Sequence, residues 1–296
     1  MTAREFELRT DDGCRLACRQ WAPRKDSGEP VKHLGAVLIV HGLGEHSGRY
    51  AHVASRLTQA GHFVVSYDQR GHGNTGGARG HARDYAVLLG DIAIVMAETR
   101  RRATDLPMFL YGHSLGGNLV LNFALRRRPG VDGVIASSPL LRPALRIPRW
   151  KTTLGHMLFK LWPAFSFNNG IDPELLSRDP NSIDAYRNDA QVHSRVSAKL
   201  AIQMLEAGEW ALSHASEWTL PLLLMHGGED QVTLADASRQ FAEQVAENGE
   251  LRIWDGLRHE LHWELEREAV LDVVVDWLAR HQPAERATDE TRTKNG

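Results

Sequence analysis

The sequence contains little cysteine and no long apolar run. Its two cysteines, Cys14 and Cys18, lie four positions apart in a strand-like segment, too far apart along an extended strand for an easy disulfide. We therefore interpret them as reduced thiols and expect a cytoplasmic protein. Residues 1–13 lack the apolar core of a secretory signal, and no later run approaches the length of a membrane span. Peripheral contact with a membrane surface stays open.

An excess of charge of either sign is also absent. Lys and Arg number 35 against 37 for Asp and Glu, a formal net charge of −2. Without a basic stripe there is no electrostatic reason to expect a nucleic-acid partner. Hydrophobic residues make up 42%, which is enough for a sizeable core and argues against disorder. A chain of 296 residues suits one large α/β domain with an insertion, or two small domains.

Two segments of the sequence are similar to known cofactor-binding and metal-binding motifs but do not match them. Gly42, Gly44 and Gly48 have a spacing that departs from the dinucleotide-binding fingerprint, and Glu45 between them would repel a phosphate. The segment 259–262 reads H-E-L-H, one residue short of the zinc motif H-E-x-x-H. We therefore expect neither a cofactor nor a metal.

Short apolar runs alternate with helical patterns along most of the chain. This alternation predicts a mostly parallel, doubly wound α/β sheet, and residues 6–9 with 14–21 predict a hairpin before it. Leu261, Leu265, Ala269, Val273 and Trp277 form one stripe of a predicted long helix over 261–280. The expected strands cover 36–40, 62–67, 107–111, 133–136, 220–225 and 251–254, and the other expected helices cover 49–60, 84–102, 234–248 and a segment after 116.

The alternation stops between residues 140 and 217. This region has no clear strand pattern, is rich in large apolar residues over 154–167 and reads as helical over 197–218. We interpret 140–217 as a helical cap, or lid, inserted between two parts of one core, 1–139 and 218–281. Residues 282–296 are polar and predict a flexible tail.

The segment from 106 to 125 carries the first candidate catalytic residue. A buried strand runs into Gly112-His113-Ser114-Leu115-Gly116, and a helical pattern follows. Strand, G-x-S-x-G and helix together predict a nucleophile elbow, in which a sharp, strained turn exposes the Ser114 hydroxyl. Glycine at the two flanking positions lets backbone approach backbone closely.

A serine nucleophile needs a histidine base, and the base needs an acid to orient it. In an elbow architecture these follow in the order serine, acid, histidine, after later strands. The loop after strand 220–225 offers Asp230, and the loop after strand 251–254 offers His259. Glu229 and Asp236 are alternative acids, Asp236 within a predicted helix. His262 is an alternative base, also on a predicted helix.

The oxyanion that forms during acyl transfer needs two backbone donors. The N–H of Leu115, directly after the nucleophile, is one. The second is expected from the loop after strand 36–40, where we assign the N–H of Leu43.

Five motifs in this order resemble the monoacylglycerol lipase and lysophospholipase-like group of serine α/β-hydrolases. They are HGLGEHSGRY, YDQRGHGNTGG, GHSLGG, GGEDQVT and RHELHWE, and the resemblance covers residues 10–281, including IDPELLSRDPNSIDAYRND in the cap. It implies an α/β-hydrolase fold and the same triad and oxyanion donors. Thr75 departs from the serine found in many relatives, a neutral change in a turn.

The resemblance also implies residues around a glycerol head group. They map to Glu45, Arg49, Tyr186 and His262, although the first two could instead form a structural ion pair and Tyr186 could simply pack. The cap before Ile171 matches poorly, so chain-length preference is not predicted. Its apolar residues could line an acyl tunnel, contact a membrane, or only pack the cap onto the core.

Together these features predict a cofactor-independent serine esterase that cleaves monoacylglycerols or similar single-chain acyl esters through an acyl-enzyme. The alternatives are a lysophospholipase and a broad carboxylesterase for short or medium chains. Dehalogenation and epoxide opening use an aspartate nucleophile, and Ser114 speaks against them. A non-catalytic binding protein is the remaining alternative. The expected partner is a small acyl ester or lipid, and the oligomeric state stays open.

Overall fold

The computed structural model describes residues 2–23, 33–144, 157 and 161–282. Eight strands form one sheet in the order β1-β2-β4-β3-β5-β6-β9-β10. The first two pairings, β1 with β2 and β2 with β4, are antiparallel and all others are parallel, which confirms the predicted mostly parallel sheet. The strands are β1 (Arg4–Arg9), β2 (Arg15–Trp21), β3 (Gly35–Val40), β4 (His62–Tyr67), β5 (Met108–His113), β6 (Gly133–Ser137), β9 (Leu222–Gly227) and β10 (Gly249–Trp254).

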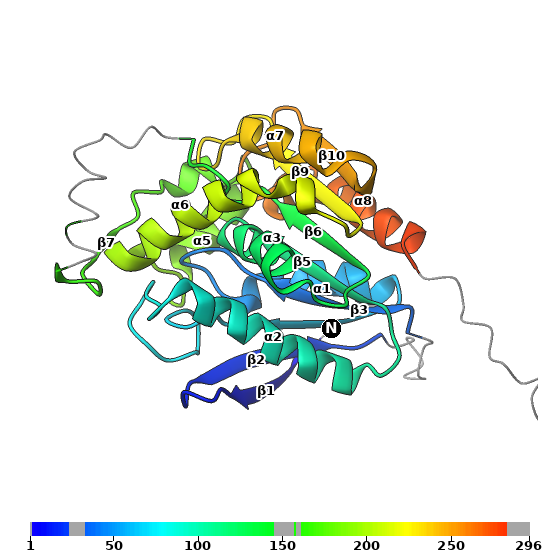
Figure 1. The fold of residues 1–296 in the computed structure, drawn as a ribbon, viewed down its shortest axis with the longest axis horizontal. Coiled ribbons are helices and arrows are strands. Elements are labelled where there is room, and N and C mark those ends of the chain that lie inside the picture. Colours follow the sequence, from blue (N-terminus) through cyan, green and yellow to red (C-terminus); the bar gives the residue numbers. More distant parts are fainter. Residues whose placement is uncertain (1, 24–32, 145–156, 158–160, 283–296) are drawn as a thin grey trace, which may run out of the picture.

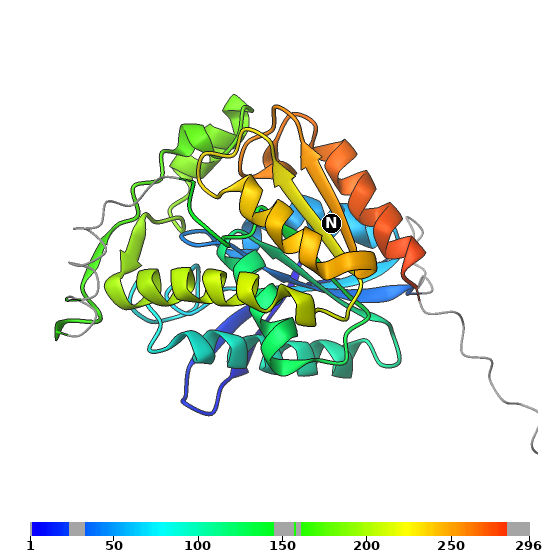
Figure 2. The same cartoon turned by 45° about the horizontal axis from the view of Figure 1, so that its top comes forward.

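Helices cover both faces of this sheet (Figures 1 and 2). One face packs against α1 (Ala51–Gln59) and α8 (Arg267–Arg280), and the other against α2 (Tyr85–Arg102), α3 (Leu115–Arg127) and α7 (Ala235–Val245). Strand β3 shows why two cores form: Val37 and Ile39 belong to one, and Leu38 and Val40 to the other. Successive side chains of a strand point to opposite faces, so a continuous apolar run supplies both.

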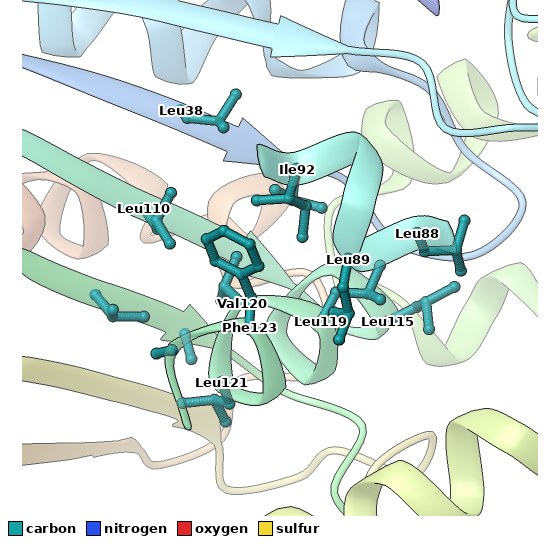
Figure 3. Close-up of a cluster of buried hydrophobic side chains, with 14 of the residues drawn as sticks. Leu38, Leu88, Leu89, Ile92, Leu110, Leu115, Leu119, Val120, Leu121 and Phe123 are labelled. Atoms are coloured by element: carbon teal, nitrogen blue, oxygen red, sulfur yellow. The ribbon is translucent and has the colours of Figure 1, made fainter. Parts of the chain in front are cut away.

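Helix α3 is fixed at the centre of the molecule by its apolar side chains. Figure 3 shows Leu119 and Phe123 of α3 beside Ile92 of α2, close to Leu38 and Leu110 of the sheet. Fully burying one such side chain contributes roughly 1.5–3 kcal/mol. The N-terminus of α3, which directly follows Ser114, therefore has a well-packed support.

Between β6 and β9 the chain leaves the sheet. It forms the 3-10 helices η2 (Pro173–Leu175) and η3 (Ala215–Glu217), the helices α5 (Pro180–Asn188) and α6 (Ala198–Ser213), and two strands, β7 (Ser166–Asn168) and β8 (Arg195–Ser197). The expectation of no strands in 140–217 was wrong, because β7 and β8 pair antiparallel. Strands of three residues are too short for an alternating pattern to be recognised. Part of the apolar run 154–167 lies outside the described residues.

The long helix predicted over 261–280 is interrupted. A 3-10 helix, η5 (Leu261–Trp263), is followed by a break before α8 begins at Arg267. Leu265 lies in this break with 59% of its surface exposed, so the predicted apolar stripe was wrong there. The buried Glu264 carboxylate holds the break by accepting hydrogen bonds from the backbone N–H groups of Arg258 (2.7 Å) and Arg178 (3.2 Å).

Within the described residues, no helix combines the length and the apolar composition that crossing a membrane requires.

Candidate active site

Ser114 lies in the sharp turn between β5 and α3. Its backbone dihedrals, φ 54° and ψ −116°, belong to a strained region for a residue with a side chain. Such a conformation costs about 1–3 kcal/mol and persists only where the surroundings enforce it. A Cβ at Gly116 would lie 1.9 Å from the Val40 carbonyl oxygen, and one at Gly112 would lie 2.3 Å from the Gly116 carbonyl oxygen. The close backbone packing explains the glycine on each side of the elbow.

Asp230 and His259 meet at the carboxyl ends of β9 and β10. The Nδ1–H of His259 donates a hydrogen bond of 2.7 Å to Oδ2 of Asp230, and Thr233 Oγ1 donates to the same oxygen at 2.8 Å. The other oxygen, Oδ1, accepts from the backbone N–H groups of Val232 (2.7 Å) and Thr233 (3.0 Å). These contacts fix the carboxylate and leave Nε2 of His259 as the free proton acceptor.

Burial and charge tune this pair. Burial would raise the pKa of Asp230, but His259 and His226 more than offset it and hold the pKa well below its usual value. Burial would lower the pKa of His259, but the Asp230 carboxylate raises it above 6.5. Asp230 therefore stays ionised, and His259 becomes a stronger base.

Ser114 and His259 line one cavity. The other lining residues are Gly42, Leu43, Glu45, His113, Ile171, Leu176, Tyr186 and Glu260. They come from loops at the carboxyl ends of the parallel strands and from the segment between β6 and β9, where ligands bind in open α/β sheets. The His113 ring lies 4.8 Å from the His259 ring, and burial lowers its pKa to about 3, so it is neutral.

The loop after β3 supplies Leu43 to this cavity and is held by Glu45. The Gly42 N–H donates to Glu45 Oε1 at 2.6 Å, and the Tyr50 hydroxyl donates to the same oxygen at 2.7 Å. A Cβ at Gly42 would lie 3.2 Å from the Ser114 Cβ, so the loop passes directly beside the nucleophile. On the other side, Leu115 is the first residue of α3, and its N–H has no acceptor within the helix.

Of the four residues predicted around a glycerol head group, two line the cavity and two do not. Glu45 and Tyr186 line the cavity. Arg49 lies behind them, with Nε 3.3 Å from Glu45 Oε2 and its guanidinium 4.6 Å from the centre of the Tyr186 ring. His262 is fully buried, stacked 4.8 Å from the Tyr50 ring, and its ring nitrogens have no hydrogen-bond partner among the described residues.

The alternative acids stand away from this arrangement. Glu229 is exposed, and the Asp236 side chain is 82% exposed and pairs with Arg239. The described part of the chain contains no group of His, Cys, Asp and Glu side chains arranged to hold a metal. A site that works without metal or cofactor stays a prediction.

Sequence reasoning missed Glu260 and Leu176 as lining residues. Glu260 directly follows His259, and this adjacency could have indicated a place near the site. The direction of its side chain, however, cannot be predicted from the sequence. Leu176 belongs to the cap motif IDPELLSRDPNSIDAYRND. This motif indicated only the family resemblance, and no contact of Leu176 with the site was predicted from it.

Comparisons with known proteins identify the family of the chain and similar solved structures. The model of the family described as Serine aminopeptidase, S33 matches residues 31–266. A monoacylglycerol lipase from Mycolicibacterium smegmatis is 32% identical over 271 residues, covering 91% of this chain and 94% of that protein. The crystal structure of a Paleococcus ferrophilus monoacylglycerol lipase superposes with a TM-score of 0.81 at 33% identity, covering 90% of this chain and 99% of that one.

A further relative is much longer. An uncharacterized abhydrolase domain-containing protein from Dictyostelium discoideum is 36% identical over 298 residues, which is 100% of this chain but 31% of that protein. The family match, the parallel sheet and the full-length similarity to lipases lead to one assignment. The chain belongs to the serine aminopeptidase S33 family, among the monoacylglycerol-lipase-like serine ester hydrolases of the α/β-hydrolase fold.

Proposed function

We propose that this protein cleaves monoacylglycerols or similar single-chain acyl esters through an acyl-enzyme formed on Ser114. His259 Nε2 takes the proton from the Ser114 hydroxyl as it attacks the ester carbonyl, and then passes it to the leaving alcohol. Water, activated by the same nitrogen, hydrolyses the acyl-enzyme. Asp230 holds the tautomer and stabilises the imidazolium. No cofactor or metal takes part.

The observation that carries this proposal is the strained Ser114 in the same cavity as a His259 tied to Asp230 at 2.7 Å. The backbone N–H groups of Leu43 and Leu115 flank the nucleophile and act as oxyanion donors. Removing one such donor costs about 3 kcal/mol in the transition state of known hydrolases.

The acyl specificity rests on apolar residues of the segment 140–217, which we propose acts as a lid. Ile171 and Leu176 face the cavity from this segment. The segment is also tied to the oxyanion loop, because the His193 N–H donates to the Gly44 carbonyl at 2.8 Å. Apolar side chains at this position suit a single fatty acyl chain.

The test uses Ser114→Ala, with the exposed Ser216→Ala as a matched control. We expect Ser114→Ala to lose turnover of 1-oleoylglycerol and p-nitrophenyl butyrate and to lose labelling by a fluorophosphonate probe, with its thermal unfolding retained. The control keeps all three. Retained activity in Ser114→Ala refutes the proposal. A preference for lysophosphatidylcholine or for short p-nitrophenyl esters over 1-oleoylglycerol identifies a lysophospholipase or a broad carboxylesterase.

We also propose that this enzyme is cytoplasmic and contacts lipid surfaces transiently through the lid segment. Large apolar side chains are exposed there: Met157, Leu161, Trp162, Phe165 and Phe167. Trp162 is 63% and Leu161 77% exposed, and such side chains insert at the interface of a bilayer. The double variant Leu161→Ser/Trp162→Ser should sediment less with phosphatidylcholine vesicles, whereas Leu265→Ser, an exposed leucine elsewhere, should not. Equal sedimentation of both variants contradicts the contact.

A further inference from the structure

Glu260 places a carboxylate in the wall of the active-site cavity, beside His259 and Ser114. Its side chain is 5% exposed, and its Oε2 accepts a hydrogen bond of 2.6 Å from Arg49 Nη2. Its other oxygen, Oε1, has no hydrogen-bond partner among the described residues. A buried residue of the cavity wall with a free acceptor is suited to receive a hydrogen bond from a substrate.

The charges around Glu260 leave this wall negative. Arg49 is shared between two carboxylates, because its Nε also lies 3.3 Å from Glu45 Oε2. One guanidinium therefore faces both Glu45 and Glu260, and the Tyr186 ring covers it at 4.6 Å. The Trp263 ring also lies 5.3 Å from this guanidinium, and Glu260, unlike Arg49, is one of the residues that line the cavity.

We propose that Glu260 selects the leaving group: its free oxygen accepts a hydroxyl of an uncharged polyhydroxy alcohol, and the same carboxylate repels an anionic head group. This rests on the proposed function, because it concerns the alcohol released from the acyl ester. In a monoacylglycerol, the glycerol part has two free hydroxyls that can donate to Glu260. In a lysophospholipid with a net negative head group, the negative charge lies at this same, alcohol end of the ester.

The ionisation of Glu260 makes this selection depend on pH. Burial raises the pKa of Glu260 to about 7, although Arg49 acts against the shift. The other titratable groups that act on it are Glu45, which raises the pKa further, and His259, which lowers it. Tyr50 and Tyr186 are neutral, since burial raises the pKa of each. Repulsion of an anion should therefore grow as the pH rises through about 7.

The test compares kcat/KM for substrates that share one acyl chain. They are 1-oleoylglycerol, methyl oleate without hydroxyls, and 1-oleoyl-lysophosphatidylglycerol, whose phosphodiester is ionised throughout the range. Glu260→Gln keeps the size of the side chain and removes its charge. Glu260→Leu also removes the acceptor. The exposed Glu268→Gln is the matched control for charge, and active sites are counted with a fluorophosphonate probe.

For the Leu variant, the preference for 1-oleoylglycerol over methyl oleate should fall about tenfold, the contribution of a hydrogen bond to a charged group. In the Gln variant, discrimination against the lysophosphatidylglycerol should fall about tenfold at pH 8 and less at pH 6. Glu268→Gln should match the wild type. A purely structural Glu260 would lower kcat/KM equally for all three esters, and such an unchanged ratio overturns the inference.

Failure of the proposed function has a different signature. If the wild type hydrolyses no ester in a Ser114-dependent way, the proposed function fails, and the leaving-group selection fails with it. If p-nitrophenyl butyrate and 1-oleoylglycerol are hydrolysed but Glu260 variants keep the wild-type ratios, only the leaving-group selection is refuted.

Discussion

Asp230→Asn tests the catalytic arrangement most directly, because the substitution preserves shape while reversing one hydrogen bond. Oδ1 of Asp230 accepts two backbone N–H groups, so the amide oxygen of Asn should take that place. The amide nitrogen then replaces Oδ2, which now accepts from His259 at 2.7 Å. An NH2 group can only donate, and the Nδ1 of His259 must become an acceptor.

The consequence follows from the tautomer. With its proton on Nε2, His259 cannot take the proton from Ser114. The equivalent change in a known serine protease lowers kcat by about 10⁴, which corresponds to roughly 5.5 kcal/mol in the activation barrier. The Asp230 carboxylate also raises the pKa of His259 above 6.5, so the acidic limb of the remaining activity should move to lower pH.

The assay is the pH profile of kcat/KM for p-nitrophenyl butyrate, with circular dichroism to verify folding. Asp236→Asn is the matched control, because the Asp236 side chain is 82% exposed on the following helix. We expect its kinetics to equal those of the wild type. The reasoning is refuted if Asp230→Asn keeps more than about a tenth of the wild-type kcat/KM, because the expected loss is about 10⁴-fold. It is also refuted if Asp236→Asn loses as much activity as Asp230→Asn.

Three further predictions test the supporting structure. Gly116→Ala places a Cβ 1.9 Å from a backbone oxygen, so urea unfolding should show a loss of at least about 3 kcal/mol or no folded protein; a stable variant contradicts the close approach. Glu45→Gln should lower kcat equally on 1-oleoylglycerol and p-nitrophenyl butyrate, because Glu45 holds the N–H of Gly42 at 2.6 Å; a loss confined to 1-oleoylglycerol would indicate a head-group role instead. Leu265→Ser should change the free energy of unfolding by less than about 0.5 kcal/mol, because Leu265 is exposed. The control, Val270→Ser at a buried position, should lower the free energy of unfolding by more than about 1 kcal/mol. Equal shifts of the unfolding temperature in the two variants would support the uninterrupted helix.

The elements of the sheet were predictable because their patterns are local and strong. Strand β3 contains a continuous apolar run rich in β-branched residues, and β4 begins at His62 and ends at Tyr67 as the sequence predicts. The grouping of the predicted site residues also follows from the sheet, because parallel strands end at one edge and the loops that follow them converge there. Ser114, Asp230 and His259 therefore came from sequence position alone.

The sequence could not show where side chains point, or at which residues tertiary contacts override the local hydrophobic pattern. Leu265 fits an apolar stripe, yet the helix is interrupted there, where the buried carboxylate of Glu264 accepts hydrogen bonds from the backbone N–H groups of Arg258 and of the distant Arg178. His262 is a polar residue in the sequence but is enclosed in an aromatic stack in the fold. Such contacts join residues far apart along the chain, and no local pattern encodes them.

The sequence by itself thus indicated the reaction class, because the serine, the acid and the histidine each follow a predicted parallel strand, and the loops after parallel strands converge at one edge of the sheet. Tertiary structure decided how the surroundings act on the substrate. Arg49 comes from the 3-10 helix η1 (Ser47–Tyr50) after β3, Tyr186 from α5 and Glu260 from the loop after β10. Their mutual distances set the charge of the cavity wall, since electrostatic interactions depend on separation in space and not along the chain.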